Sequence, residues 1–247
     1  MKKMNKDNTL FPDEWPRSQK ILVILAHPDD PEFFCGASLV RWAQAGHEIH
    51  YFILTCGDKG GDPAMTSEQL CTIRHKEQLK AAAVIGVKSV RFLDLEDGFL
   101  LPTIDLRRDI VRVIRQLQPD ILVTCDPTNL YPRENTLNHP DHRYAGQAVL
   151  DAVFPAAGNI HFFPELVKDE GLEPYTPREI WISLTANPTV TLDVTDTWPR
   201  KIMALKEHKS QIGDPIKFEL RMESRRSDRS TPDKNFYDEK FRVIKFG

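Results

Sequence analysis

The chain has 247 residues, 40% of them hydrophobic and 28% charged, and a formal net charge of -3. This size and apolar content predict a single domain with one sizeable core over residues 1–247. The near-neutral charge gives no reason to expect nucleic acid or an anionic membrane as a partner. No apolar stretch reaches the roughly 18 residues that a membrane span requires, so no span is expected.

Residues 1–19 lack the apolar segment of a secretory signal and are expected to form a polar arm ahead of the domain. The cysteines are scattered without C-x-x-C pairing, which is typical of small buried hydrophobic residues in a reducing compartment. We therefore expect a cytoplasmic protein. The four positions are Cys35, Cys56, Cys71 and Cys125.

Strand and helix patterns alternate through the first half of the chain. Short apolar runs predict buried strands at residues 21–26, 50–55, 89–93 and 121–125. Helical periodicity lies between them, at residues 33–46, 66–85 and 103–118. This alternation predicts an α/β, Rossmann-like three-layer fold, with a mainly parallel sheet flanked by helices. No G-x-G-x-x-G follows the first strand, which argues against a dinucleotide cofactor.

The second half is less regular. Residues 154–175 are proline-containing and predict a long loop, where we expect substrate choice to be made. The charged segment 213–235 predicts a solvated, mobile loop. The remaining elements expected are helices at 140–153 and 198–211 and strands at 179–184, 189–194 and 241–244, with the second of these strands at a sheet edge.

The segment HPDDPE at residues 27–32 directly follows the first predicted strand. Open α/β sheets bind ligands at the carboxyl ends of their parallel strands. His27 and Asp30 are three residues apart, which places both side chains on one side of a helical turn. Taken alone, this segment also fits an ordinary capped turn, since Asp is a good N-cap and Pro is common at the first helical position.

A second segment with the same spacing, HPDH at residues 139–142, follows the loop after the fourth predicted strand. Catalytic zinc takes about three protein ligands from His, Asp or Glu. Two such segments, each near the end of a predicted strand, predict a metal site between them.

These residues carry a family resemblance. AHPDDPEFFCGASL and NHPDH resemble the two motifs of the PIG-L (LmbE-like) family of metal-dependent N-acetylglucosaminyl de-N-acetylases. Weaker similarities lie in LTCGDKGGD, FLDLEDG, HKSQ and YDEKFRVI, so the resemblance extends over nearly the whole chain.

The resemblance implies a hydrolase that removes an acetyl group from the amine of an N-acetylglucosamine-type conjugate. It implies Zn²⁺, or another divalent ion such as Fe²⁺, held by His27, Asp30 and His142. Asp29 matches the family's general base. The implied partner is a small-molecule amino-sugar conjugate, and a homo-oligomer is compatible with the family.

The resemblance also assigns residues around the reacting group. A protonated His139 is expected to stabilise the oxyanion, and Asp141 to orient His139 and favour its charged form. Lys59, Arg74 and Asp97 are expected to contact substrate.

Leu137 stands where some members of the family have a tyrosine that assists the oxyanion or the leaving group. Tyr131 and Tyr144 are the nearby candidates to replace it. Arg74 also fits a surface ion pair with Glu77.

Two other functions remain open from the sequence. A metallohydrolase of a different amide or ester would carry the same ligands, and so would a non-catalytic metal-binding member of the fold. His208 fits a surface histidine, a packed histidine or one that lies behind the site.

Overall fold

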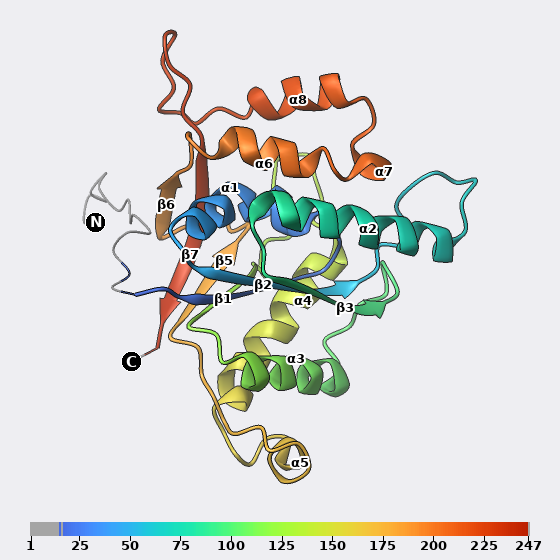
Figure 1. Cartoon of the computed structure of the whole chain (residues 1–247), viewed down its shortest axis with the longest axis vertical. Coiled ribbons are helices and arrows are strands. Elements are labelled where there is room, and N and C mark those ends of the chain that lie inside the picture. Colours follow the sequence, from blue (N-terminus) through green and yellow to red (C-terminus); the bar gives the residue numbers. More distant parts are fainter. Residues whose placement is uncertain (1–14, 16, 247) are drawn as a thin grey trace.

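The computed structural model describes residue 15 and residues 17–246, which contain a seven-stranded sheet in the order β3-β2-β1-β4-β5-β7-β6 (Figure 1). The strands are β1 (Lys20–Leu25), β2 (Glu48–Thr55), β3 (Ser89–Leu95), β4 (Ile121–Cys125), β5 (Glu179–Ser183), β6 (Val190–Asp193) and β7 (Asp238–Lys245). The helices are α1 (Asp30–Gln44), α2 (Ser67–Ile85), α3 (Ile104–Leu117), α4 (Pro140–Asp151), the π-helical turn η2 (Ala152–Ala157), α5 (Pro164–Lys168), α6 (Trp198–Leu205), α7 (Lys209–Ile212) and α8 (Pro215–Glu223).

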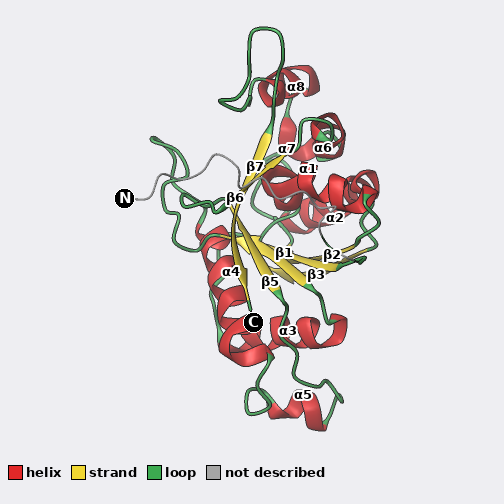
Figure 2. Ribbon diagram, turned by 90° about the vertical axis from the view of Figure 1, so that its left-hand side faces the viewer, coloured by secondary structure: helices red, strands yellow, loops and turns green. Residues whose placement is uncertain are grey.

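The sheet is parallel from β3 to β5 and antiparallel where β7 joins β5 and β6. Helices α1 and α2 lie on one face of the sheet, with α6 packed against them on the same side, and α3 and α4 cover the other face (Figures 1 and 2). The predicted α/β three-layer class is therefore confirmed. None of the helices in the described part of the chain is both long and apolar enough to cross a membrane.

The core lies along the central strands, because these are buried on both faces. All residues of β4 are buried, as are those of β1 after Lys20. Strand β6 alternates buried and half-buried residues and forms one edge of the sheet, as the sequence predicts. A continuous apolar run thus distinguishes the central strands from the edge.

Strand β7 enters the sheet between β5 and β6 and also anchors α1. The Glu239 carboxylate accepts hydrogen bonds from the backbone N–H groups of Ala37 (3.1 Å) and Ser38 (2.7 Å), and it pairs with Lys201 Nζ at 2.7 Å. Helix α1 has a non-helical residue at Cys35, where the regular backbone ladder is interrupted. Glu239 therefore supplies acceptors to the turn that follows the break.

The C-terminal prediction needs correction. Residues 213–235 were expected to form a loop, but they contain α8. The Asp214 side chain caps this helix and Pro215 occupies its first turn, while Phe218 and Met222 bury one face. The i,i+4 pair was present in the sequence, but the surrounding charges obscured it.

Three other boundaries differ from the sequence prediction. Region 154–175 contains part of η2 and all of α5, so it is not simply a loop. Predicted helix 198–211 is divided into α6 and α7, with His208 at the break. Helix α1 begins three residues earlier than predicted, at Asp30, because Pro31 fits the first helical turn.

The predicted arm lies mostly outside the description, since residues 1–14 and 16 are not described. Trp15 is described, and its ring packs against Trp42, His47 and Trp181 with centroid distances of 5.6, 5.0 and 5.8 Å. This end of the arm is therefore attached to the domain core.

Candidate active site

The two His-Pro-Asp segments meet at the point where the strand order reverses. Strand β1 pairs with β2 on one side and β4 on the other. The loop after β1 carries residues 27–30, and the loop after β4 leads to residues 139–142 at the start of α4. Open α/β sheets form a crevice at such a switch point, because the adjoining loops run in opposite directions.

Three side chains converge there in the way that the sequence predicts. His142 Nε2 lies 3.1 Å from Asp30 Oδ1 and 3.2 Å from His27 Nδ1. His27 Nδ1 lies 3.4 Å from Asp30 Oδ2. Two imidazole nitrogens and a carboxylate within these distances form a donor set that suits zinc or a similar divalent ion.

Neighbouring groups orient both histidine rings. The Nδ1 of His142 lies 3.0 Å from Asn138 Oδ1, which can only accept a hydrogen bond, so Nδ1 carries the proton and Nε2 faces the cluster. The Nε2 of His27 lies 2.9 Å from Asp97 Oδ1 and 3.4 Å from Asp141 Oδ2. Ligating histidines commonly have such partners on the nitrogen that does not bind the metal.

The charges at the cluster favour a cation. Burial alone would lower the pKa of His27, but the carboxylates of Asp30, Asp141 and Asp97 raise it well above its ordinary value. Burial would raise the pKa of Asp30, but His142 and His27 hold it well below its usual range. The residues therefore fit a divalent ion both in donor type and in charge.

Asp29 adjoins this donor set in an unusual conformation. Its φ of 100° is left-handed, and its backbone N–H donates to Gln78 Oε1 at 2.8 Å. Its Oδ2 lies 3.3 Å from Arg74 NH2. Burial raises the pKa of Asp29 to about 6, opposed by Arg74 and assisted by the negative charge of Asp30. A carboxylate with a pKa in this range is suited to general-base catalysis.

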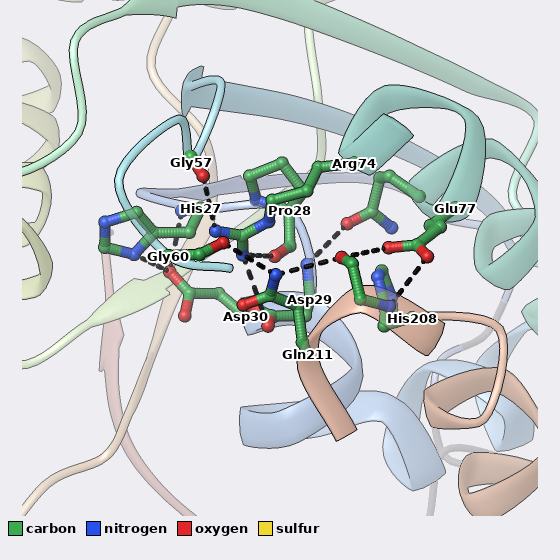
Figure 3. A network of polar contacts seen from close by, with 12 residues as sticks. His27, Pro28, Asp29, Asp30, Gly57, Gly60, Arg74, Glu77, His208 and Gln211 are labelled. Carbon is green, nitrogen blue, oxygen red and sulfur yellow. Dashed lines mark hydrogen bonds and ion pairs between the residues drawn. The ribbon is translucent and has the colours of Figure 1, made fainter. Parts of the chain in front are cut away.

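Arg74 supports the loops, as Figure 3 shows. Its NH1 donates to Gly57 O at 2.9 Å and its NH2 to Pro28 O at 2.5 Å. Gly57 has a φ of 68°, and a Cβ there would lie 2.2 Å from the guanidinium, so only glycine fits. The structure thus brings Arg74 to the site, as predicted, with its hydrogen bonds directed to the chain itself.

The other two predicted substrate contacts differ in position. Asp97 is buried beside His27, and its backbone N–H donates to Asp58 Oδ1. Lys59 lies next to Asp58 on the loop after β2, and its side chain is exposed. Its Nζ pairs with Asp58 at 3.1 Å and with Glu96 at 2.7 Å. Asp97 therefore joins the cluster directly, whereas Lys59 lies outside it.

The side chains of His139 and Asp141 do not pair with each other, because each has a different hydrogen-bond partner. The backbone N–H of Asp141 donates to His139 Nδ1 at 3.2 Å, which leaves Nε2 to carry the proton. The fully buried Asp141 carboxylate accepts from the backbone N–H groups of Gly98 (2.7 Å) and Leu100 (3.3 Å). Burial and the nearby His27 lower the pKa of His139, and Asp141 only partly opposes them. The expected charged form of His139 is thus disfavoured.

A buried polar chain behind Asp29 was largely missed by the sequence analysis. Gln78 Nε2 donates to both Glu32 oxygens at 3.1 Å, and Glu32 Oε2 lies 3.2 Å from His208 Nε2. His208 is fully buried, so it is not a surface histidine. Glu77 accepts from both the N–H and the hydroxyl of Ser210 (Figure 3 labels Glu77 and His208). Helices α1, α2 and α7 are thereby joined behind the site.

No signal in the sequence identified Gln78, because it lies on a helix without a motif. Asn138 could have been noticed, since it directly precedes His139. Leu137 is 72% exposed and Tyr131 is 65% exposed. No contact of Tyr131 or Tyr144 with the histidine cluster is observed in the described residues.

Comparisons with known proteins identify the family of the chain. The family model described as GlcNAc-PI de-N-acetylase matches residues 22–153, and the chain belongs to this PIG-L family. Diacetylchitobiose deacetylase of Thermococcus kodakarensis is 31% identical over 80% of this chain and 72% of its own length. A probable N-acetyl-α-D-glucosaminyl L-malate deacetylase of Bacillus anthracis is 27% identical over 79% and 83%.

A solved structure shows the same similarity in three dimensions. N,N'-diacetylchitobiose deacetylase from Pyrococcus horikoshii superposes with a TM-score of 0.82 and 30% identity, covering 92% of this chain and 84% of that one. The predicted class, a hydrolytic N-deacetylase, is confirmed by these relatives.

Proposed function

We propose that this N-deacetylase uses Zn²⁺, or a similar divalent ion, to remove the acetyl group from an N-acetylglucosamine unit of a small sugar conjugate. The observation that carries the proposal is the convergence of His27, Asp30 and His142 with the carboxylate of Asp29 beside them. Nitrogen and oxygen donors of this kind accept zinc readily, and the adjoining carboxylate can act as a base.

His27, Asp30 and His142 would hold the ion, which would supply Lewis acidity to polarise a carbonyl and to make water more acidic. Asp29 takes the proton of the water molecule that attacks the acetamide carbon. Its pKa of about 6 leaves it mostly ionised at neutral pH yet able to hold the proton. Two neighbours hold Asp29 in position: Arg74 pairs with its carboxylate, and Gln78 accepts a hydrogen bond from its backbone N–H.

His139 lies at the exposed side of the cluster. Its Nε2–H donates a hydrogen bond to the acetamide oxygen, which becomes negative when water attacks the carbon. A neutral imidazole can make this hydrogen bond, so a charged His139 is not required. The C–N bond then breaks, Asp29 returns the proton to the amine nitrogen, and the products are acetate and a free amino sugar.

The names of the similar proteins support a sugar substrate. One is a diacetylchitobiose deacetylase, and the other is named as a probable N-acetyl-α-D-glucosaminyl L-malate deacetylase. Both named compounds contain an acetylated glucosamine, and they differ in what is attached to it. We therefore propose the acetylated glucosamine as the recognised unit.

The test is amine release from N-acetylglucosamine, N,N'-diacetylchitobiose, N-acetylglucosaminyl malate and N-acetylglucosaminyl inositol. Metal-stripped protein is assayed with and without Zn²⁺ or Fe²⁺, and Asp29→Asn is the control. Metal-dependent release that is lost in Asp29→Asn supports the proposal. Release from simple esters or other amides, but from no sugar, would favour the alternative metallohydrolase. Metal binding without turnover on either panel would favour a non-catalytic member.

The four cysteines are all free, which supports a reducing compartment. We propose the cytoplasm, and a tagged chain followed by fractionation tests it. Recovery with a periplasmic or secreted marker would contradict it.

A further inference from the structure

A second group of metal-binding side chains lies at the edge of the sheet, on the outer side of α2. Cys71 and His75 are one helical turn apart and face Asp94, near the end of β3. His75 Nε2 lies 2.8 Å from Asp94 Oδ1 and 3.8 Å from Cys71 Sγ. One ligand atom from each of the three residues lies within 4.8 Å of the others.

The histidine ring is held in one orientation. It stacks on Phe92, with centroids 3.9 Å apart and planes inclined by 22°. Because the ring cannot turn freely, Nε2 remains directed toward the sulfur and the carboxylate. A ligand fixed in this way loses little freedom when a metal binds.

The three donors suit zinc. One sulfur, one imidazole nitrogen and one carboxylate oxygen leave room for a fourth ligand from solvent, as in zinc sites that have three protein ligands. The soft sulfur donor distinguishes this set from the candidate active site, whose three proposed ligands are nitrogen and oxygen. Cys56 follows β2 and lines the neighbouring cleft, but it is not one of the three.

The surroundings are accessible and negatively charged. A cleft of about 270 Å³ borders the group and is lined by both thiols, Asp94, Asp58, Glu68 and Glu96. Lys59 pairs with two of these carboxylates and neutralises only part of their charge. A cation can therefore reach the sulfurs, and the local charge favours it.

We propose that Cys71, His75 and Asp94 form a second metal site, which takes a thiophilic divalent cation such as Zn²⁺. The site would link the end of β3 to the first half of α2. It lies near the candidate active site, because Arg74 directly precedes His75 on α2.

Binding must release the proton of the Cys71 thiol. Metal binding at a thiol displaces its proton, so occupancy should increase with pH.

Co²⁺ titration of the full, reduced, metal-free chain tests this site. Thiolate–Co²⁺ bonds give near-ultraviolet charge-transfer absorption, which nitrogen and oxygen ligands do not give. We expect this absorption to saturate at about one equivalent and to be displaced by Zn²⁺. It should be lost in Cys71→Ser and reduced in His75→Gln.

Two controls separate this site from the other features of the chain. His142→Ala removes a proposed active-site ligand and should keep the full absorption. Cys35→Ala removes a fully buried thiol in α1 and should also keep it. Failure of the proposed deacetylation would leave these spectra unchanged, so the two proposals can fail separately.

A second measurement uses the wild-type chain and does not depend on whether a variant folds. Zn²⁺ should slow the alkylation of Cys71, identified by mass spectrometry. The proposal is overturned if reduced wild-type protein shows no thiolate–Co²⁺ absorption, if Cys71→Ser retains it, or if Zn²⁺ does not protect the Cys71 thiol.

Discussion

The two His-Pro-Asp segments have nearly the same sequence but place their side chains in different surroundings. In both, the fourth residue contributes to the central cluster, since Asp30 and His142 lie 3.1 Å apart. The first residues differ: His27 is buried within the cluster, whereas the His139 side chain is 40% exposed at its edge. The shared sequence pattern therefore places the fourth residue of each segment in the cluster. The surroundings of the other residues depend on what packs against them.

The third residues differ most. Asp29 has a left-handed backbone, and its carboxylate faces Arg74. Asp141 is regular helix, and its carboxylate binds the backbone of Gly98 and Leu100. An aspartate at the same position of the pattern is thus suited to proton transfer in the first segment and to holding a loop in the second.

Replacing His142, the proposed metal ligand at the end of the second His-Pro-Asp segment, should have the largest effect. We expect His142→Ala to weaken metal binding by more than the ~10- to 100-fold that loss of a ligand's hydrogen-bond partner costs, and to abolish activity. Isothermal titration of Zn²⁺ into metal-free protein measures the change, with the exposed His161→Ala as control. Full Zn²⁺ affinity at the nitrogen and oxygen site in His142→Ala would remove this residue from the ligand set.

Asp29→Asn should separate chemistry from metal binding. We expect kcat to fall by roughly 10²- to 10⁴-fold while Zn²⁺ affinity changes little, because the amide cannot act as a base. Asparagine tolerates the left-handed conformation, so the fold should be kept. The matched control is Asp169→Asn on the surface after α5. Wild-type kcat in Asp29→Asn would transfer the role of base to another group.

His139→Ala should be less severe, with a fall in kcat of about 10²- to 10³-fold, because one hydrogen-bond donor to the oxyanion is lost. His139→Gln keeps a donor without a charge. If a neutral donor suffices, Gln should recover much of the activity that Ala loses. Equal loss in both variants would indicate that the charged imidazolium is required after all.

Asp141→Asn should act mainly on stability. The two backbone N–H groups bond to different oxygens of Asp141, and an amide nitrogen in place of one oxygen cannot accept, so one N–H loses its buried acceptor and the free energy of unfolding should fall by about 1–3 kcal/mol. Urea denaturation measures it, with the exposed Asp105→Asn in the first turn of α3 as control. Unchanged stability together with a large fall in kcat would show that Asp141 participates in the chemistry and is not only an anchor.

Much of the fold follows from the sequence because its signals are local. The apolar runs at β1, β2 and β4 required no partner to be recognised, and the alternation with helices predicted the parallel sheet. The spacing of His27 with Asp30, and of His139 with His142, predicted the cluster of candidate metal ligands for the same reason: residues three apart share a helical face.

Tertiary structure alone decided the contacts between distant segments. Gln78, Glu32 and His208 meet across separations of 46 and 176 residues, and no local pattern marks the first of them. The separate partners of Asp29 and Asp141, and the meeting of Cys71 and His75 with Asp94, depend in the same way on how helices pack on the sheet. Residue spacing determines which side chains share a turn, but only the folded chain determines what lies opposite them, because that depends on long-range packing.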